Sequence, residues 1–208
     1  MNQKNLLGLN NCFLDLDDPI QLFKTWMDEA KKSEPNDPNA VSLATSNKNN
    51  FPSVRMVLLK DFSQNGFVFY TNLKSKKGNE LKENPKVAMC FHWKSLLRQI
   101  RINGTVTQVA DEVADKYYNS RSYESRIGAW ASKQSEELIN RDQLINSIKE
   151  YKNKYNEENK VPRPSHWSGW ILSPLSIEFW LDGDNRIHER LKYTKASSGQ
   201  WSKSLLSP

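Results

Sequence analysis

The feature that most constrains the fold is a series of short β-rich segments bounded by turn-forming residues such as Gln64-Asn65-Gly66. Apolar and β-branched residues favour strands, and Gly and Asn mark the places where a chain reverses direction. A meander of this kind predicts an antiparallel sheet or barrel. The expected strands are 40–45, 54–60, 67–71, 87–93, 99–109, 167–173, 176–181, 186–193 and 199–205.

Helical patterns interrupt this meander. Apolar residues recur at helical spacing between Ile20 and Met27, after the start signal Asp18-Pro19, and predict a helix to about Ser33. Further helices are expected at about 74–84, 111–121 and 136–156. A chain of 208 residues can bury one sizeable core. We therefore expect one mainly β domain decorated with helices over residues 18–208, preceded by a flexible arm over residues 1–17.

Composition narrows the class of protein. The net charge of +6 fits either a nucleic-acid surface or small phosphate pockets. Lysines alternate with acids such as Glu136-Glu137, so a continuous basic patch, and with it nucleic-acid binding, is not expected. Cys12, Cys90 and three scattered histidines offer neither a disulfide framework nor a metal site. No apolar run has the length of a membrane span, and no secretory signal is visible, so a cytoplasmic location is expected.

A hairpin near the C-terminal end predicts a binding site. Residues 177–180 form the first strand, 181–185 the turn, and Arg186, His188 and Arg190 then lie on one face of the return strand, because strand side chains alternate. Three potential cations on one face repel one another unless an anion lies against them. Trp180 enters from the partner strand. The combination suits a flat, negatively charged aromatic ligand.

Three other groups have phosphate-binding chemistry, and each has a plain structural alternative. Arg55 and Lys60 flank an apolar strand that is expected to be buried and, being five residues apart, point to opposite faces. They are either solvated strand ends or contacts for separate groups. Lysines at a helix N-terminus oppose the macrodipole unless a phosphate binds there, with Thr71 and Ser75 as further donors. The cationic residues of that group are Lys74, Lys76 and Lys77.

The third group lies in and after the expected helix from residue 111. Tyr117, Arg121 and Ser125 follow one line of a helix face if the helix continues, and all three can donate to phosphate oxygens. Gln99 on a strand and Gln134-Ser135, expected to open a helix, supply amides that donate and accept, as a heterocyclic ring edge demands. Such combinations also arise by chance in polar helices and on surfaces.

Taken together, these segments resemble the pyridoxine/pyridoxamine 5′-phosphate oxidase family. The resemblance runs from about Asp15 to the C-terminus, and several long motifs occur in one order. The motifs are RMVLLK at 55–60, FYTNLKSKK at 69–77, RQIRINGTV at 98–106, RIGAWASKQS at 126–135 and IEFWLDGDNRIHER at 177–190.

The resemblance implies an antiparallel, FMN-binding split β-barrel whose homodimer builds each site across the subunit interface. It implies catalytic roles for Arg186 and His188 beside the pyridine ring. It also implies a substrate site formed by Lys60, Tyr117, Arg121 and Ser125 together with those two residues. The implied FMN-binding residues are Arg55, Met56, Val57, Leu58, Leu59, Lys60, Tyr70, Thr71, Lys76, Lys77, Gln99, Gln134, Ser135, Trp180 and Arg190.

The chemistry implied by the resemblance is oxidation of pyridoxine 5′-phosphate and pyridoxamine 5′-phosphate to pyridoxal 5′-phosphate. A hydride passes from C4′ to FMN, and O₂ then takes the electrons and becomes hydrogen peroxide. Leu181, Ile171 and Lys76 depart from the usual family residues and place the rate and substrate preference in question. Two alternatives are a related split-barrel flavin reductase and a non-catalytic pyridoxal phosphate binder.

Overall fold

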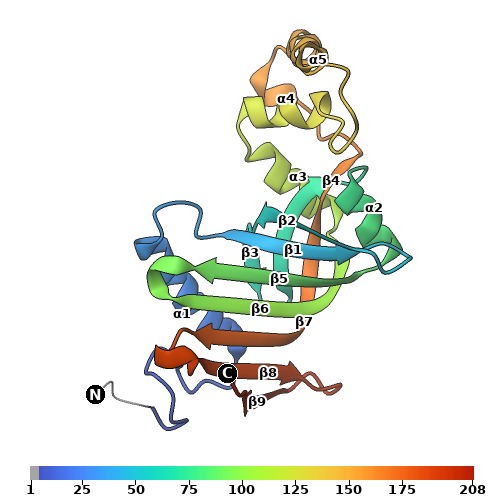
Figure 1. Cartoon of the computed structure of the whole chain (residues 1–208). Coiled ribbons are helices and arrows are strands. Elements are labelled where there is room, and N and C mark those ends of the chain that lie inside the picture. The colour runs from blue at the N-terminus through green and yellow to red at the C-terminus, as the bar shows by residue number, and fades with distance from the viewer. Residues whose placement is uncertain (1–4) are drawn as a thin grey trace.

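The computed structural model describes residues 5–208 and consists of a curved antiparallel sheet with helices at its ends and against one face (Figure 1). Seven strands follow the order β2-β1-β5-β6-β7-β4-β3, β8 pairs with β7, and β9 pairs with β8. The strands are β1 (Ala40–Ser46), β2 (Pro52–Leu58), β3 (Asp61–Ser63), β4 (Gly66–Asn72), β5 (Lys86–Trp93), β6 (Arg98–Gln108), β7 (Trp167–Leu181), β8 (Glu189–Lys195) and β9 (Trp201–Leu205).

The helices are α1 (Pro19–Ser33), α2 (Lys76–Glu83), α3 (Asp111–Asn119), α4 (Tyr123–Ala131) and α5 (Arg141–Lys154). Short 3₁₀ turns occupy Lys94–Leu96, Glu158–Lys160 and Asp184–Arg186. Figure 1 shows that α4 and α5 project from one end of the sheet. The antiparallel, mainly β architecture with helical decoration is thus confirmed.

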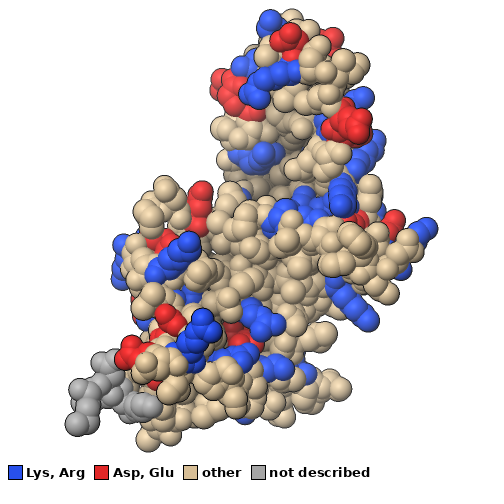
Figure 2. Space-filling model, viewed as in Figure 1, with Lys and Arg blue, Asp and Glu red and all other residues tan. Residues whose placement is uncertain are grey.

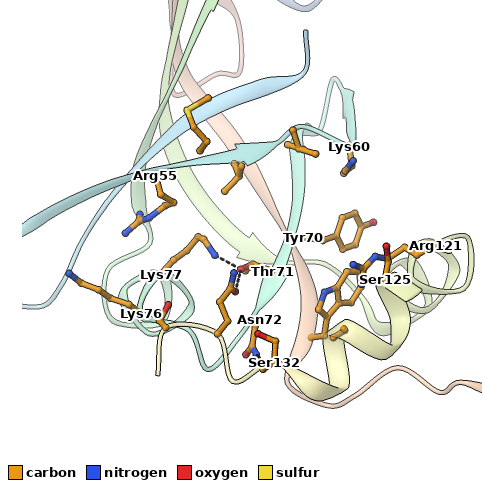
Figure 3. A pocket seen from close by; sticks show the side chains of 18 of the residues that line it. Arg55, Lys60, Tyr70, Thr71, Asn72, Lys76, Lys77, Arg121, Ser125 and Ser132 are labelled. Carbon is orange, nitrogen blue, oxygen red and sulfur yellow. Dashed lines mark hydrogen bonds between the residues drawn. The ribbon is translucent and has the colours of Figure 1, made fainter. Parts of the chain in front are cut away.

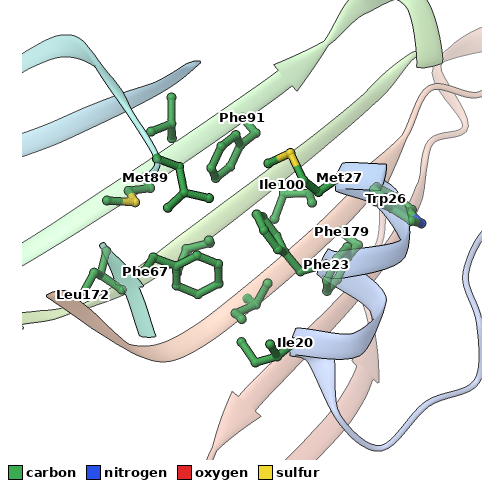
Figure 4. Packing of buried hydrophobic residues seen from close by; sticks show 14 of the residues in the cluster. Ile20, Phe23, Trp26, Met27, Phe67, Met89, Phe91, Ile100, Leu172 and Phe179 are labelled. Carbon is green, nitrogen blue, oxygen red and sulfur yellow. The ribbon is translucent and has the colours of Figure 1, made fainter. Parts of the chain in front are cut away.

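Helix α1 closes the core on one side of the sheet. Asp18 caps it by accepting from the backbone N–H of Ile20 at 2.9 Å, and Pro19 occupies its first turn. Its apolar face is buried, and the ring of Phe23 packs edge-on against Phe67 and Phe91 from the sheet (Figure 4). The helix predicted for residues 18–33 is therefore confirmed, and its burial supplies much of the hydrophobic stabilisation.

The segment expected to be a flexible arm lies partly outside the described residues, because residues 1–4 are not described. Residues 5–17 contain no regular helix or strand, but the side chains of Leu9 and Phe13 are buried in the core. Trp26 donates its indole N–H to the carbonyl of Cys12 at 2.7 Å, and Tyr193 donates to the carbonyl of Leu16 at 2.8 Å. These contacts attach residues 9–16 to the sheet and to α1.

Several expected boundaries differ for local reasons. The expected strands 167–173 and 176–181 form one strand, β7, which bends where Gly104 of β6 approaches it. A Cβ on Gly104 would lie 2.2 Å from the carbonyl oxygen of Ser173, so only glycine permits this approach. Strand β2 ends at Leu58 rather than Lys60, and β3 was not predicted. The helix expected from residue 136 begins at Arg141, where Asn140 caps it.

Two predictions about side-chain placement are wrong. The helix from residue 111 does not continue through Arg121. It stops at Asn119, and Ser122 caps a separate helix, α4, by accepting from the N–H of Ser125. The return strand expected from residue 186 begins only at Glu189, so Arg186 and His188 lie in the preceding loop rather than beside Arg190 on a strand face.

Candidate functional site

A cavity of about 870 Å³ lies between the sheet and the helices at one end of the molecule (Figure 3). Strands β2 and β4, helices α2, α3 and α4, the loop after α4 and the first residue of β7 form its walls. Figure 2 shows Lys and Arg side chains gathered at the base of the helical projection. The predicted site residues that line the cavity are Arg55, Met56, Val57, Leu58, Lys60, Tyr70, Thr71, Lys76, Lys77, Tyr117, Arg121, Ser125, Gln134 and Ser135.

One side of the cavity is cationic. Ser75 caps α2 by accepting from the N–H of Gly78, which places Lys76 and Lys77 in the first helical turn. Lys77 is 7% exposed and donates to the hydroxyl of Thr71 (Figure 3). Burial, and then the charge of Arg55, lowers the pKa of Lys77 to about 8. Among the described residues no carboxylate bonds this buried ammonium ion, which makes it a ready partner for a phosphate.

Arg55 is held at the same side of the cavity by polar groups beneath it. It donates to the hydroxyl of Thr45 and to Oε2 of Glu80, the latter at 3.0 Å. The prediction that strand β2 is buried is wrong for one of its faces. Arg55 and Val57 point inward, whereas Val54 is 70% and Met56 60% exposed. Leu59 also departs from the predicted set, since it is 5% exposed, belongs to the hydrophobic core and does not line the cavity.

The opposite side of the cavity combines aromatic rings with Arg121. The rings of Tyr70 and Tyr117 stack at 4.0 Å between centroids, and Trp167 lies nearly parallel to Tyr70 at 5.2 Å. The guanidinium of Arg121 lies 4.8 Å from the Trp167 ring centre. Burial lowers the pKa of Arg121, and its Nη1 has no hydrogen-bond partner within the described part of the chain. This buried donor also needs an acceptor.

Tyr117, Arg121 and Ser125 do meet, but through a turn between two helices rather than along one helix. Tyr118, which is fully buried, donates to the carbonyl of Arg126 at 3.0 Å and fixes α3 against α4. Arg163 attaches α3 to the start of β7. Its guanidinium bonds Asp111 at 2.7 Å, Asp115 at 2.5 Å and the carbonyl of Trp167 at 2.9 Å.

The remaining predicted residues form a second group away from the cavity. Gln99, Trp180 and Arg190 are cross-strand neighbours on β6, β7 and β8. Arg190 forms ion pairs with Glu178 at 2.7 Å, and the ring of His188 lies 4.7 Å from that of Trp180. Arg186 is exposed and has a φ of 65°. The prediction that Arg186, His188 and Arg190 share one strand face is therefore wrong, because the loop ends only at His188.

Sequence reasoning missed several cavity residues. Trp167 follows a proline-rich loop and carried no motif of its own, although its ring forms one wall. Asn72 donates to the carbonyl of Ser132 at 3.4 Å and so connects β4 to the loop after α4. Gln134-Ser135 does not open a helix, since Ser135 has a φ of 74° and α5 starts later. The other missed lining residues are Ser53, Val54, Gly128 and Ala129.

The described residues form neither a metal site nor a membrane-spanning helix. Between residues 5 and 208, no three His, Cys, Asp or Glu side chains gather as a metal site. Over the same residues, no helix is both long and apolar enough to cross a membrane.

Comparison with known proteins decides the family. Residues 27–155 match the family model described as pyridoxamine 5′-phosphate oxidase. Residues 167–208 match the model for the pyridoxine 5′-phosphate oxidase C-terminal dimerisation region. The chain belongs to the pyridoxamine 5′-phosphate oxidase family.

Relatives in this family match the chain over all or nearly all of its length. The chain is 73% identical over 208 residues to the pyridoxine/pyridoxamine 5′-phosphate oxidase of Pelagibacter ubique, covering 100% of both chains. It is 54% identical to the protein of the same name from Allorhizobium ampelinum, covering 94% of this chain and 95% of that one. Membership of this oxidase family, proposed from the motifs, is confirmed.

A solved structure confirms the fold. PhzG from Burkholderia lata, determined in complex with tetrahydrophenazine-1-carboxylic acid, superimposes with a TM-score of 0.87 at 29% identity. It covers 93% of this chain and 94% of that chain. The predicted split-barrel architecture is therefore confirmed.

Proposed function

We propose that this chain oxidises pyridoxine 5′-phosphate and pyridoxamine 5′-phosphate to pyridoxal 5′-phosphate with FMN as its cofactor. The observation that carries the proposal is one cavity with two separate cationic groups, each of which contains a buried nitrogen donor (Figure 3). Lys77 belongs to one group and Arg121 to the other. Cofactor and substrate each carry a phosphate, so two anion sites in one cavity match this pair of ligands.

The donor set of the cavity fits FMN. Lys76, Lys77, Arg55 and Thr71 would hold its phosphate, and the depressed pKa of Lys77 marks a burial cost that an anion would offset. Gln134 and Ser135 would bond the ring edge or phosphate from the loop after α4. When bound, FMN would supply the acceptor for a hydride from C4′ of the substrate, with O₂ as the final acceptor of the electrons.

Lys60, Tyr117, Arg121 and Ser125 would bind the substrate phosphate. Nη1 of Arg121, which has no hydrogen-bond partner among the described residues, lies in the turn between α3 and α4, and Ser125 lines the same cavity from α4. Arg121 is braced by Trp167, so its guanidinium loses little freedom when it binds an anion. These groups position C4′ rather than react themselves.

We further propose that a second copy of the chain completes each site. Gln99, Trp180, Arg186, His188 and Arg190 do not line the cavity of their own chain, and all but Gln99 belong to the region matched by the dimerisation model. The exposed apolar face of β2, with Val54 and Met56 beside the cavity, offers a surface for the partner. Arg186 and His188 of the partner subunit would then flank the pyridine ring, and its Trp180 and Arg190 the cofactor.

The deciding experiment is an anaerobic absorption spectrum of the FMN-loaded protein before and after addition of pyridoxine 5′-phosphate. Bleaching of the flavin bands, with recovery on admission of air, supports the oxidase. Flavin bands that ignore both this substrate and pyridoxamine 5′-phosphate point instead to a related flavin reductase. Failure to hold FMN favours a pyridoxal phosphate binder.

A further inference from the structure

The loop that joins β7 to β8 has a tightly determined backbone. A Cβ on Gly183 would lie 2.0 Å from the carbonyl oxygen of Ile187, so any other residue would force the loop apart. Asn185 and Arg186 have φ angles of 55° and 65°, in the left-handed region that non-glycine residues seldom adopt. Surrounding contacts must hold such a conformation in place.

Asp182 supplies two of those contacts. Its backbone N–H donates to the carbonyl of Leu97 at 2.9 Å, which anchors the start of the loop to the residue immediately before β6. Its carboxylate Oδ1 lies 2.9 Å from Nδ1 of His188, at the far end of the loop. The side chain therefore bridges the two ends of the loop that carries Arg186.

The imidazole of His188 is held on several sides. The Trp180 ring lies 4.7 Å away between centroids, at an interplanar angle of 40°. The backbone N–H of Gly183 lies 3.3 Å from the same Nδ1 that faces Asp182. These two neighbours favour opposite tautomers, since a carboxylate accepts a hydrogen bond from Nδ1–H, whereas a backbone N–H donates a hydrogen bond to an unprotonated Nδ1. The contact to Asp182 is shorter and charge-assisted, so it dominates.

We propose that Asp182 is a positioning residue that holds the neutral imidazole of His188 as the Nδ1–H tautomer. Nε2 is then the free acceptor, able to take a hydrogen bond from the hydroxyl or amino group on C4′. The catalytic consequence rests on the proposed function, whereas the tautomer does not. None of the sequence motifs distinguished Asp182 from Asp184, which lies in the same loop and forms no side-chain hydrogen bond or ion pair with His188.

The tautomer is tested on the protein without substrate by NMR of ¹⁵N-labelled histidine, at a pH where the imidazole is neutral. Three histidines give few signals, and His188→Gln identifies the one of interest. We expect a protonated Nδ1 and an unprotonated Nε2 in the original chain. Asp182→Asn should shift this equilibrium toward Nε2–H, whereas the matched control Asp184→Asn should not. A protonated Nε2 in the original chain, or an unchanged spectrum in Asp182→Asn, overturns the proposal.

Steady-state kinetics tests the consequence for catalysis. Asp182→Asn should lower kcat about 10- to 100-fold, the range expected when a reacting group is misplaced, with little change in KM because the phosphate site is untouched. Asp184→Asn should keep the original kcat. Equal kcat values for Asp182→Asn and the original chain overturn the positioning role. If the original chain lacks oxidase activity, the proposed function fails, while the NMR result still decides the Asp182–His188 contact.

Discussion

Glu80 of α2 and Arg55 of β2 form a partly buried ion pair beneath the cationic side of the cavity, with Oε2 3.0 Å from Nη2. The hydroxyls of Thr45 and Ser53 also donate to Glu80, at 2.5 and 2.8 Å. Burial opposes ionisation of this carboxyl, but the three hydrogen-bond donors outweigh burial and hold its pKa below the usual value. The ion pair therefore fixes the guanidinium of Arg55 at the cavity wall.

Because of this ion pair, we expect the free energy of unfolding to fall in acid. The pKa of Glu80 is lower in the folded chain than in the unfolded one, so its contribution is present above the ordinary value of 4.5 and disappears as the pH falls through the folded value. We expect Glu80→Gln to lower the free energy of unfolding at pH 7 by about 1–3 kcal/mol and to flatten the loss of stability in acid. Urea unfolding from pH 7 to pH 3 measures both. Glu83→Gln, on the exposed side of the same helix, is the control, and an unchanged acid slope in Glu80→Gln would contradict the prediction.

Because the pKa of Lys77 is lowered, we expect the affinity for FMN to depend on pH. Its pKa of about 8 in the free protein means that it is largely neutral above that pH, while a bound phosphate favours the charged form. Binding of FMN should therefore take up a proton above about pH 8, and its Kd should rise up to about tenfold per further pH unit. Quenching of flavin fluorescence from pH 7 to 9.5 measures this.

Two comparisons isolate Lys77. Riboflavin lacks the phosphate and should show no such dependence. Lys77→Arg should remove the dependence for FMN because a guanidinium stays charged. The same pH profile in Lys77→Arg would assign the proton to another group.

We expect substitutions of Arg121 to weaken substrate binding alone. Arg121→Ala removes the buried donor from the proposed phosphate site, and we expect a rise in KM of about 10- to 100-fold, as for loss of a charge-assisted hydrogen bond. Arg121→Lys keeps the charge but loses the planar contact with Trp167, so an intermediate KM is expected. An unchanged KM in Arg121→Ala would remove this residue from the site.

We expect changes at Arg186 to slow turnover without weakening the binding of FMN. Arg186→Ala should lower kcat about 10- to 100-fold while FMN remains bound, because the guanidinium would flank the reacting ring rather than the cofactor. Arg186→Gly also removes the side chain, but it relieves the left-handed backbone at φ 65°. Similar kcat values for the two variants would assign the loss to the guanidinium, whereas loss of FMN in both would show that Arg186 binds the cofactor.

We expect the exposed apolar face of β2 to lie in the dimer interface. Met56 is 60% exposed in the single chain, and Met56→Glu would place a charge on the apolar face beside the cavity. We expect sedimentation to show a monomer that binds FMN more weakly, because the partner would no longer supply Trp180 and Arg190. Lys48→Glu, in the loop between β1 and β2, adds the same charged group away from this face. A Met56→Glu dimer with unchanged FMN affinity would contradict the proposed arrangement.

The sequence by itself determined the elements whose signals are local. The cap and apolar spacing of α1 and the alternation of strand and turn residues depend on neighbours within a few positions. Local residue patterns likewise predicted binding roles for Arg55, Lys77 and Arg121, and all three line the cavity.

Tertiary structure alone decided how these elements meet. Ser122 restarts a helix and so brings Arg121 and Ser125 together across a turn, and Gly183 and Asp182 keep His188 off the strand. Trp167 became part of the cavity only because β7 begins beside α3. The placement of Trp167 depends on contacts between residues far apart in the chain, and the two turns depend on a specific cap, a close backbone approach and a side-chain ion pair, none of which periodicity encodes.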